Sequence, residues 1–167
     1  MIGWFHAKKG DNNNNILQNA LVTVDGTSFS ANTDATGAYN ITNVPIGSYS
    51  MTASLNGYSN QTKTGNLVVQ GQTTYVDFSL VQLGRFVGRV IDFFTLAPIN
   101  GATVNALQNG TVIGSTTTDS TGNYIISLLP GSYDVSASAT GYITQTSTNR
   151  PIFGGSDTVV NFYLFVG

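Results

Sequence analysis

Apolar and polar residues alternate in short stretches along the whole chain, with a period of two. The stretches lie at 20–24, 49–55, 76–80, 102–106, 133–139 and 160–164. Because successive side chains of a strand point to opposite faces, each stretch predicts a strand with one buried face. Turn signals separate them: Asp25-Gly26, Asn56-Gly57, Asn109-Gly110 and Pro130-Gly131. No stretch has the spacing of an amphipathic helix, so the pattern predicts an all-β chain.

The second half of the chain repeats the first. Thr33-Asp34-Ala35-Thr36-Gly37-Ala38-Tyr39 returns as Thr118-Asp119-Ser120-Thr121-Gly122-Asn123-Tyr124, and Gly47-Ser48-Tyr49 returns as Gly131-Ser132-Tyr133. The repeat predicts two tandem domains, 1–83 and 84–167. The boundary near 82–85 is short and poor in proline and serine, so we expect a stiff connection.

Composition excludes several classes of partner. Charged residues make up 8% of the chain, net charge is −2, and all eight acidic residues are aspartate. Without a basic patch, nucleic acid is a poor candidate partner. No run of 18 apolar residues predicts a membrane span, and the apolar run 1–5 is too short for a signal peptide. With no cysteine, disulfides and thiolate metal sites are excluded.

The repeated motifs resemble a known family, and the second copy fits it best. The motifs are Gly88-Arg89-Val90, Gly101-Ala102-Thr103-Val104, Asp119 to Tyr124, Pro130 to Val135 and Gly141-Tyr142. In this order they resemble the carboxypeptidase regulatory-like domain. The resemblance implies a transthyretin-like, Ig-like seven-stranded β-sandwich for each copy, similar to the B-type repeats of bacterial collagen adhesins. The first copy departs from the pattern at residues 3–5 and 11–15.

The resemblance also carries expectations about function. The family implies accessory, adhesive, stalk or filament roles in extracellular proteins, and some carbohydrate binding. It does not imply catalysis, and fold alone does not determine function. We therefore expect an extracellular or cell-surface location and a structural or cell-adhesion role.

The chain offers little catalytic chemistry. His6 is the only histidine, so a Ser-His-Asp arrangement has one candidate base, and a lone histidine is not a site. Glycoside hydrolysis needs two carboxyl groups across a cleft, whereas the aspartates here fall in turns. Neither a phosphate-binding glycine loop nor a zinc motif is present. We expect no catalytic residue, no cofactor and no metal site, and hence no enzyme.

Two other features have structural and functional interpretations. Asp34 and Asp119 begin equivalent Asp-x-x-Gly turns, in which the carboxylate accepts backbone hydrogen bonds; the alternative is calcium binding, which a single carboxylate supports poorly. The loop 11–15 is read as solvated, with ion binding as the alternative. Lys8 and Lys9 are candidates for an internal isopeptide bond as in the adhesin repeats, but no glutamate is present to promote it.

Three Asn-x-Ser/Thr sequons are candidate glycosylation sites: Asn40, Asn60 and Asn109. All three are expected to face solvent. Asn-, Ser- and Thr-rich sequences produce such sequons by chance, but a surface with few charges favours glycans for solubility. Glycans are therefore candidate partners or modifications.

The two ends of the chain are apolar on both faces of the predicted strands. The candidate assembly residues are Ile2, Trp4, Phe5, Phe162, Leu164, Phe165 and Val166. Apolar ends and open strand edges favour pairing with another chain. We hypothesise that copies join head to tail into an extracellular filament, with strand addition as one route. The alternative is that both ends pack within their own domains as edge strands.

Two further functions compete with the filament subunit. A carbohydrate- or surface-binding adhesion module needs a platform of outward aromatics, for which Phe93, Phe94 and Tyr163 are candidates. A virion decoration protein would share the fold and the low charge.

Overall fold

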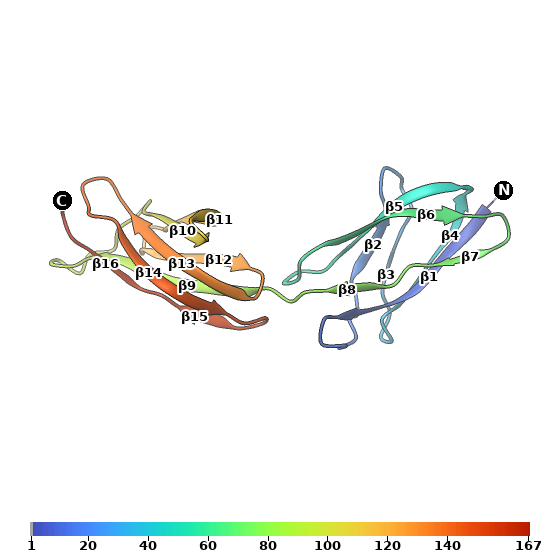
Figure 1. Ribbon diagram of the computed structural model, residues 1–167, viewed down its shortest axis with the longest axis horizontal. Helices are drawn as coiled ribbons and strands as arrows, with labels where there is room; N and C mark the ends of the chain where they lie inside the picture. Colours follow the sequence, from blue (N-terminus) through green and yellow to red (C-terminus); the bar gives the residue numbers. More distant parts are fainter. Residues whose placement is uncertain (1) are drawn as a thin grey trace. The chain divides into compact units, whose positions relative to one another are not determined.

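The computed structural model describes the backbone of residues 2–167 and the side chains of these residues except 4 and 6–9. The chain divides into two compact units, Met1–Gln82 (unit 1) and Leu83–Gly167 (unit 2). In each unit, two sheets face one another (Figure 1). No helix that is long and apolar enough to cross a membrane occurs in this part of the chain.

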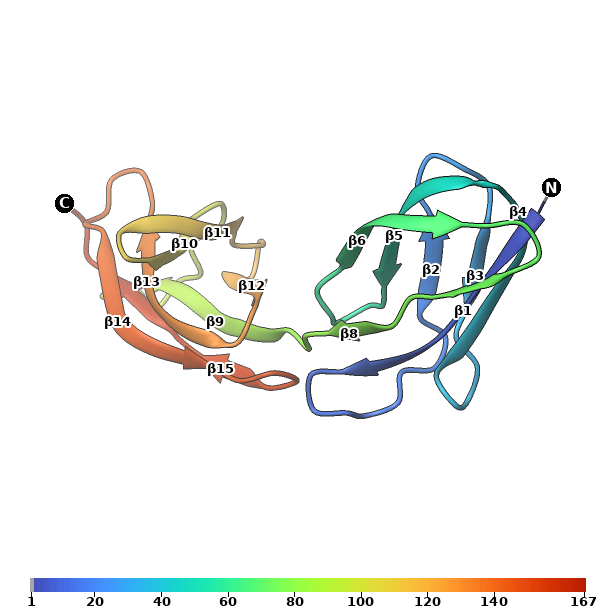
Figure 2. The same cartoon turned by 45° about the vertical axis from the view of Figure 1, so that its right-hand side comes forward.

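Unit 1 is built from two sheets that the chain visits alternately (Figure 2). The first sheet has the order β4 (Ala38–Pro45), β1 (Ile2–Asp11), β7 (Thr73–Tyr75), and β8 (Phe78–Leu80) also pairs with β1. The second has the order β3 (Ser30–Asn32), β2 (Leu21–Val24), β5 (Gly47–Ser54), β6 (Gln61–Val68). The long strand β1 is therefore central in its sheet.

Unit 2 repeats this topology. One sheet has the order β12 (Asn123–Leu128), β9 (Gly84–Asp92), β15 (Asp157–Val159), and β16 (Phe162–Leu164) also pairs with β9. The other has the order β11 (Thr111–Thr117), β10 (Thr103–Gln108), β13 (Gly131–Ser138), β14 (Gln145–Ile152). The prediction of two tandem all-β sandwiches is confirmed.

The last strand of each sandwich is interrupted, so seven expected strands appear as eight segments. In unit 1 both segments, β7 and β8, run parallel to β1. Between them the hydroxyl of Tyr39 donates a hydrogen bond to the carbonyl of Val76 at 2.5 Å, and Tyr124 donates to Val160 at 2.6 Å. Burial raises the pKa of both tyrosines, which keeps the hydroxyls protonated as donors.

The inward positions of the strands form one core in each unit. Alternate residues of β10 and β13, such as Val104 and Val135, are buried, as the period of two predicts. Each core contains an edge-to-face aromatic pair between its two sheets: Phe5 with Tyr49 at 6.5 Å and Phe86 with Tyr133 at 6.1 Å between ring centroids. The two copies therefore share their packing as well as their topology.

Candidate assembly surfaces

The N-terminal strand is not an open edge. β1 pairs antiparallel with β4 on one side, where Ile2 lies opposite Pro45, and parallel with β7 and β8 on the other. Its backbone groups are thus engaged within unit 1. β1 therefore packs within its own domain, as the alternative expects, but as a central strand and not as an edge strand. Strand addition by β1 would require it to leave its partners β4 and β7 in its own sheet.

The candidate assembly residues fall into three groups. Phe5, Phe162 and Leu164 are almost fully buried in the cores, so they are not available as contact surface, and this part of the expectation is wrong. The side chain of Trp4 lies outside the described residues, as do those of His6, Lys8 and Lys9. The remaining three, Ile2, Phe165 and Val166, are exposed or half-buried.

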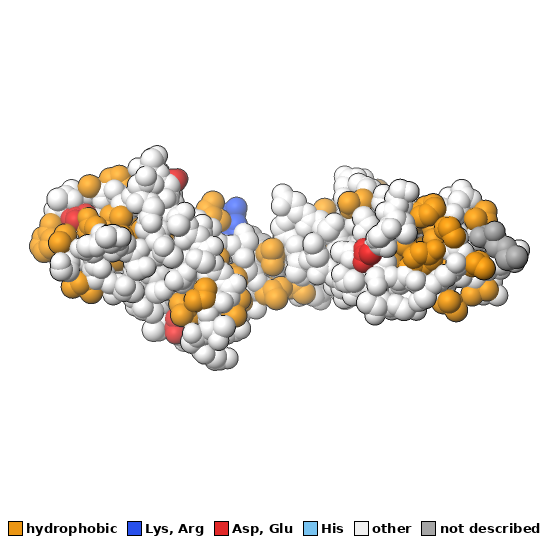
Figure 3. Space-filling view, turned by 90° about the horizontal axis from the view of Figure 1, so that it is seen from above, with side chains coloured by type: hydrophobic (Ala, Val, Ile, Leu, Met, Phe, Trp, Pro, Cys, Tyr) orange, Lys and Arg blue, Asp and Glu red, His pale blue; other side chains and the backbone are white. Residues whose placement is uncertain are grey.

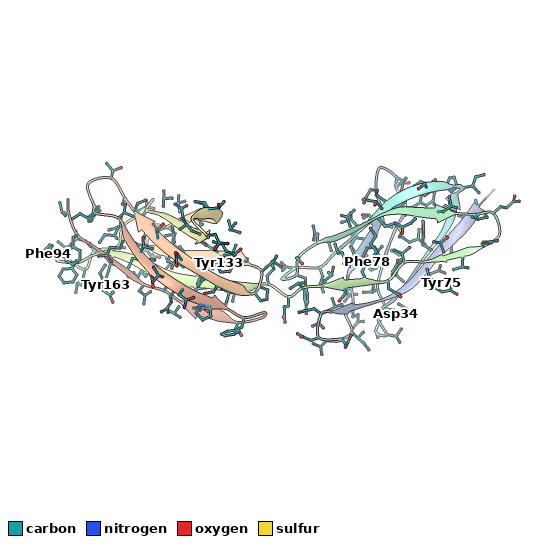
Figure 4. The ribbon with its side chains drawn as sticks, in the orientation of Figure 1. Asp34, Tyr75, Phe78, Phe94, Tyr133 and Tyr163 are labelled. Carbon is teal, nitrogen blue, oxygen red and sulfur yellow. The ribbon has the colours of Figure 1, made fainter. Side chains whose placement is uncertain are left out.

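Unit 2 ends in an exposed cluster that we call the aromatic cap. Its residues are Phe93, Phe94, Leu96, Ile143, Phe165 and Val166. The rings of Phe93 and Phe165 stack at 4.2 Å, and Phe94 meets them edge-on at 5.3 and 6.0 Å. Phe94 is 73% exposed and projects from the end of the unit (Figure 4). The three rings therefore support one another while remaining open to solvent.

Backbone hydrogen bonds hold the cap in place. The Phe93 amide donates to the Leu164 carbonyl at 2.9 Å, and the Ile143 amide donates to the Phe165 carbonyl at 2.8 Å. The first bond joins the loop after β9 to the last residue of β16, and the second joins the loop after β13 to the residue that follows β16. The cap is therefore assembled from three segments that the fold brings together.

Asp92 fixes the turn that carries Phe93 and Phe94. Its buried carboxylate accepts the amides of Phe94 and Thr95 at 2.9 and 2.7 Å, and the hydroxyl of Tyr142 at 3.0 Å. The hydrogen bond from Thr95, foremost among these, lowers the pKa of Asp92 below its ordinary value against the effect of burial. The hydrogen bond that the Tyr142 hydroxyl donates to Asp92 raises the pKa of Tyr142.

Unit 1 has a related turn that is one residue shorter and carries polar side chains, since the amide of Asp11 donates to Asn15 and that of Asp92 donates to Ala97. The carboxylate of Asp11 accepts the amides of Asn13 and Asn15 at 2.9 and 2.8 Å, and the Asn12 amide donates to the Leu80 carbonyl at 3.0 Å. Burial raises the pKa of Asp11, but the hydrogen bonds from Asn15 and Asn13 outweigh it and leave the pKa lowered. The turn itself does not require aromatic residues, since four asparagines follow Asp11.

A second exposed apolar cluster lies at the N-terminal end of unit 1, and we call it the N-terminal patch. Its residues are Ile2, Ile46, Leu67 and Val69. Strand pairing brings them together, because Ile2 lies opposite Pro45 and Gly47 lies opposite Val68. Figure 3 shows hydrophobic side chains gathered at this end of the unit. The segments 44–48 and 67–72 contain no charged residue.

The sequence predicted only some residues of the aromatic cap, and it predicted them for two different functions. Phe165 and Val166 were candidates for assembly, and Phe93 and Phe94 were candidates for carbohydrate binding, whereas Leu96 and Ile143 were missed. A usable signal was the comparison of 11–15 with 92–97, where the two copies place asparagine and phenylalanine after equivalent aspartates. The N-terminal patch was missed except for Ile2, because Ile46 and Val69 lie in turns that alternation does not describe.

The sequon asparagines lie on the surface. Asn40 is an exposed position of β4, Asn60 is exposed just before β6, and Asn109 is exposed in the two-residue turn between β10 and β11, with φ of 51°. Their exposure leaves room for a glycan. Glycosylation of the three sites stays a prediction.

The aspartates of the Asp-x-x-Gly turns accept hydrogen bonds within their turns. In unit 2, Oδ1 of Asp119 accepts the amides of Thr121 and Asn123 at 2.8 and 3.0 Å and the Thr121 hydroxyl at 2.6 Å. The Thr121 hydroxyl is the main cause of a lowered pKa of Asp119. Oδ1 of Asp34 makes the matching bonds in unit 1. Both carboxylates thus have a structural role, and no cluster of three His, Asp or Glu residues that could hold a metal occurs among the described side chains.

One shallow pocket of about 260 Å³ lies on the outer face of unit 2 and is lined by Arg89, Ile91, Asn161 and Tyr163. The Arg89 side chain donates to the carbonyl of Thr121 at 2.8 Å, and its amide donates to the side chain of Asn161 at 2.9 Å. Tyr163 is 45% exposed beside them. The pocket therefore combines an aromatic ring with hydrogen-bonding groups.

The comparison with protein families decides the membership of the chain. The carboxypeptidase regulatory-like domain matches residues 10–81 and again residues 85–165. The chain belongs to this family. The resemblance inferred from the motifs is thereby confirmed, in two tandem copies.

One curated relative and several solved structures are similar to the chain. Bacillopeptidase F of Bacillus subtilis is 31% identical over 129 residues, which is 75% of this chain and 9% of that protein. Solved structures include the Bacillus anthracis TIE protein (18% identity, 99% of this chain and 34% of that chain, TM-score 0.44) and the minor pilin of Streptococcus agalactiae (14%, 99% and 96%, 0.45). A shaft pilin of Lactobacillus rhamnosus GG, a mutant form, has 11% identity, full coverage of both chains and a TM-score of 0.45. The chain spans a small fraction of the curated relative's length.

Proposed function

We propose that this chain is a non-catalytic structural subunit of an extracellular filament or surface appendage, built from the repeats 1–83 and 84–167, whose copies associate head to tail. The observation that carries the proposal is the aromatic cap, a preorganised cluster of exposed rings on an otherwise ordinary sandwich. Soluble monomers rarely expose contiguous apolar clusters unless these have a partner.

Three features support a structural role over a catalytic one. Both sandwiches have closed cores filled by side chains. The aspartates with lowered pKa values, Asp11, Asp92 and Asp119, accept hydrogen bonds within their own turns. The chain belongs to the carboxypeptidase regulatory-like family, for which accessory, adhesive, stalk or filament roles are expected and catalysis is not.

Strand addition through β1 is not part of this proposal, because β1 already has partners on both sides. Association through side chains at the two ends needs no rearrangement of either sandwich. Glycans on Asn40, Asn60 and Asn109 would keep the long faces soluble without covering the cap, which is formed by other segments.

The test is the assembly state of the purified full chain over a wide concentration range. Light scattering and negative-stain electron microscopy are expected to show species that grow with concentration and appear as linear assemblies. A chain that remains monomeric at every concentration, and forms no filaments, contradicts the proposal.

A carbohydrate-binding adhesion module is the second candidate, favoured by the pocket of Arg89, Asn161 and Tyr163. Its test is a glycan array probed with the full chain and with Tyr163→Ala. Binding that disappears in the variant, from a chain that stays monomeric, would favour this function over the filament.

A further inference from the structure

We propose that the aromatic cap on unit 2 of one molecule docks on the N-terminal patch on unit 1 of a second copy of the same chain. The inference rests on the proposed function and deepens it, since it names both surfaces of the head-to-tail contact. It replaces strand exchange by a contact between preformed side-chain clusters.

The first argument comes from comparing the two copies of the loop. After equivalent aspartates, unit 1 has Asn12 and Asn13 where unit 2 has Phe93 and Phe94, and both loops make the same backbone bond to the last strand of their unit. The backbone of this loop therefore does not require phenylalanine at positions 93 and 94. Two exposed phenylalanines in unit 2 need another explanation, and burial against a partner supplies one.

The second argument is backbone strain at Leu96. Its φ is 57° and its side chain is 62% exposed, whereas unit 1 has Asn14 with φ of 63° in its version of the loop. Asparagine adopts this left-handed conformation more readily than leucine, which adopts it at a cost in backbone strain. A strained, exposed leucine in the cap is explained if its side chain is buried in an interface.

The third argument identifies the occupant from charge. The cap segments 93–96, 142–143 and 163–167 contain no charged residue, and neither do the patch segments 44–48 and 67–72. No charged side chain of these segments would lose its water in such a contact, which favours an apolar interface. The patch offers branched aliphatic side chains, and aromatic rings pack well against these.

Other occupants fit the cap less well. A sugar needs free hydrogen-bonding groups beside the rings. The polar side chains nearest the rings, Asp92 and Tyr142, are already hydrogen-bonded to each other. A lipid surface is usually approached with lysine or arginine near the apolar residues, and the cap segments have none. A cap-to-cap contact would bury the same rings but would close as a dimer.

Cap and patch are different surfaces on different units, so the contact is heterologous. Every molecule that joins presents a new free cap and a new free patch. Such a contact propagates unless its geometry closes a ring.

The experiment uses two variants of the full chain. The cap variant is Phe93→Ser with Phe94→Asn. It keeps the backbone amide of residue 93 bonded to Leu164 and that of residue 94 bonded to Asp92, and it places polar residues where unit 1 also carries them. The patch variant is Ile46→Gln with Val69→Asn. A matched control is Phe153→Asn, which removes a ring 65% exposed that belongs to neither cluster.

Sedimentation velocity is expected to show self-association of the unmodified chain, and of the control, that weakens at least about tenfold in either variant. An equimolar mixture of the two variants is expected to form dimers and stop there, because one intact cap meets one intact patch. Circular dichroism and thermal unfolding verify that both variants are folded.

The outcomes separate the inference from the proposed function. If the unmodified chain assembles and the cap variant assembles equally well, the docking inference is overturned and the filament proposal stands. If the cap variant alone loses association and the patch variant keeps it, the contact is cap to cap and the inference is overturned. A chain that stays monomeric overturns both, and cap-dependent flotation with phosphatidylcholine vesicles would then assign the cap to lipid.

Discussion

At the scale of single residues, the two copies share a buried threonine that closes the loop before the second strand. In unit 2, Oγ1 of Thr118 accepts the Ala102 amide at 2.9 Å and donates to the Ile99 carbonyl at 2.6 Å. Thr33 makes the corresponding bonds to Ala20 and Leu17 in unit 1. Each threonine satisfies a buried amide and a carbonyl with one hydroxyl.

Thr118→Val is expected to destabilise unit 2 by about 2 kcal/mol, because it leaves both backbone groups without this partner while preserving shape. Urea unfolding measures the change. Thr117→Val, on the exposed neighbour, is the control and is expected to shift stability by less than about 0.5 kcal/mol. Equal effects of the two substitutions would contradict this role for the hydroxyl.

The aspartate turns predict how stability depends on pH. Folding lowers the pKa of Asp92 and Asp119 below the ordinary value of 3.8, so both stabilise the fold above that pH. The stabilisation is lost as pH falls below about 4, through the folded-state pKa values, since the unfolded chain then binds more protons. When unfolding is measured between pH 7 and pH 2, the denaturant concentration at the midpoint is expected to decrease as the pH falls below about 4.

Asp92→Asn separates the contribution of one turn. The amide oxygen of Asn still accepts from the loop, but the residue does not titrate in this range. The variant is expected to be less stable than the unmodified chain at pH 7 and to lose less stability on acidification. If the variant loses as much stability on acidification as the unmodified chain, Asp92 does not contribute to the pH dependence.

At the scale of elements, the cap loop combines strain with exposure. Leu96→Asn is expected to stabilise unit 2 by about 0.5–1 kcal/mol, because Asn adopts a positive φ with less strain than Leu. The same substitution is expected to weaken association, since it removes an apolar side chain from the cap. Thermal unfolding and sedimentation on one preparation measure both effects, and a destabilised variant would contradict the strain argument.

The elements show what sequence alone can provide. Alternation along 133–139 and 160–164 predicted which side chains are inward, and Val135, Phe162 and Leu164 are indeed buried. Alternation says nothing of which strands are neighbours, so the central place of β1 between β4 and β7 was not predicted. Apolar residues on both faces of the ends therefore left two alternatives, free surface and packing within the same domain, and Phe5 and Leu164 follow the second because they complete the cores.

The candidate surfaces were partly predictable for a related reason. Comparison of the repeats can locate the equivalent turns at Asp11 and Asp92, although the loop 11–15 was interpreted only as a solvated or ion-binding loop. The cap itself depends on Phe93, Ile143 and Phe165 coming together from three segments, and the hydrogen bonds that join these segments follow from tertiary structure. The alternation of apolar and polar residues along one strand does not show which segments come together in space, so it does not predict such a cluster.

At the scale of the whole molecule, the proposed contact would involve few charged side chains. The total of 6 basic and 8 acidic residues is already low, and the two clusters lie in segments that contain none of them. Assembly would therefore depend on apolar burial, and long-range electrostatic steering would contribute little.

This gives a prediction about salt. Raising sodium chloride from about 50 to 500 mM is expected to leave the association constant within about threefold, because no charge pair in the contact is screened. Ammonium sulfate is expected to strengthen association, and the heat capacity change of association is expected to be negative, since both follow from burial of apolar surface. Dilution calorimetry at several temperatures and sedimentation across the salt series measure these quantities. An association that weakens steeply with sodium chloride would indicate an electrostatic contact, such as one through Arg85, Arg89 or Arg150, and would move the interface away from the cap and the N-terminal patch.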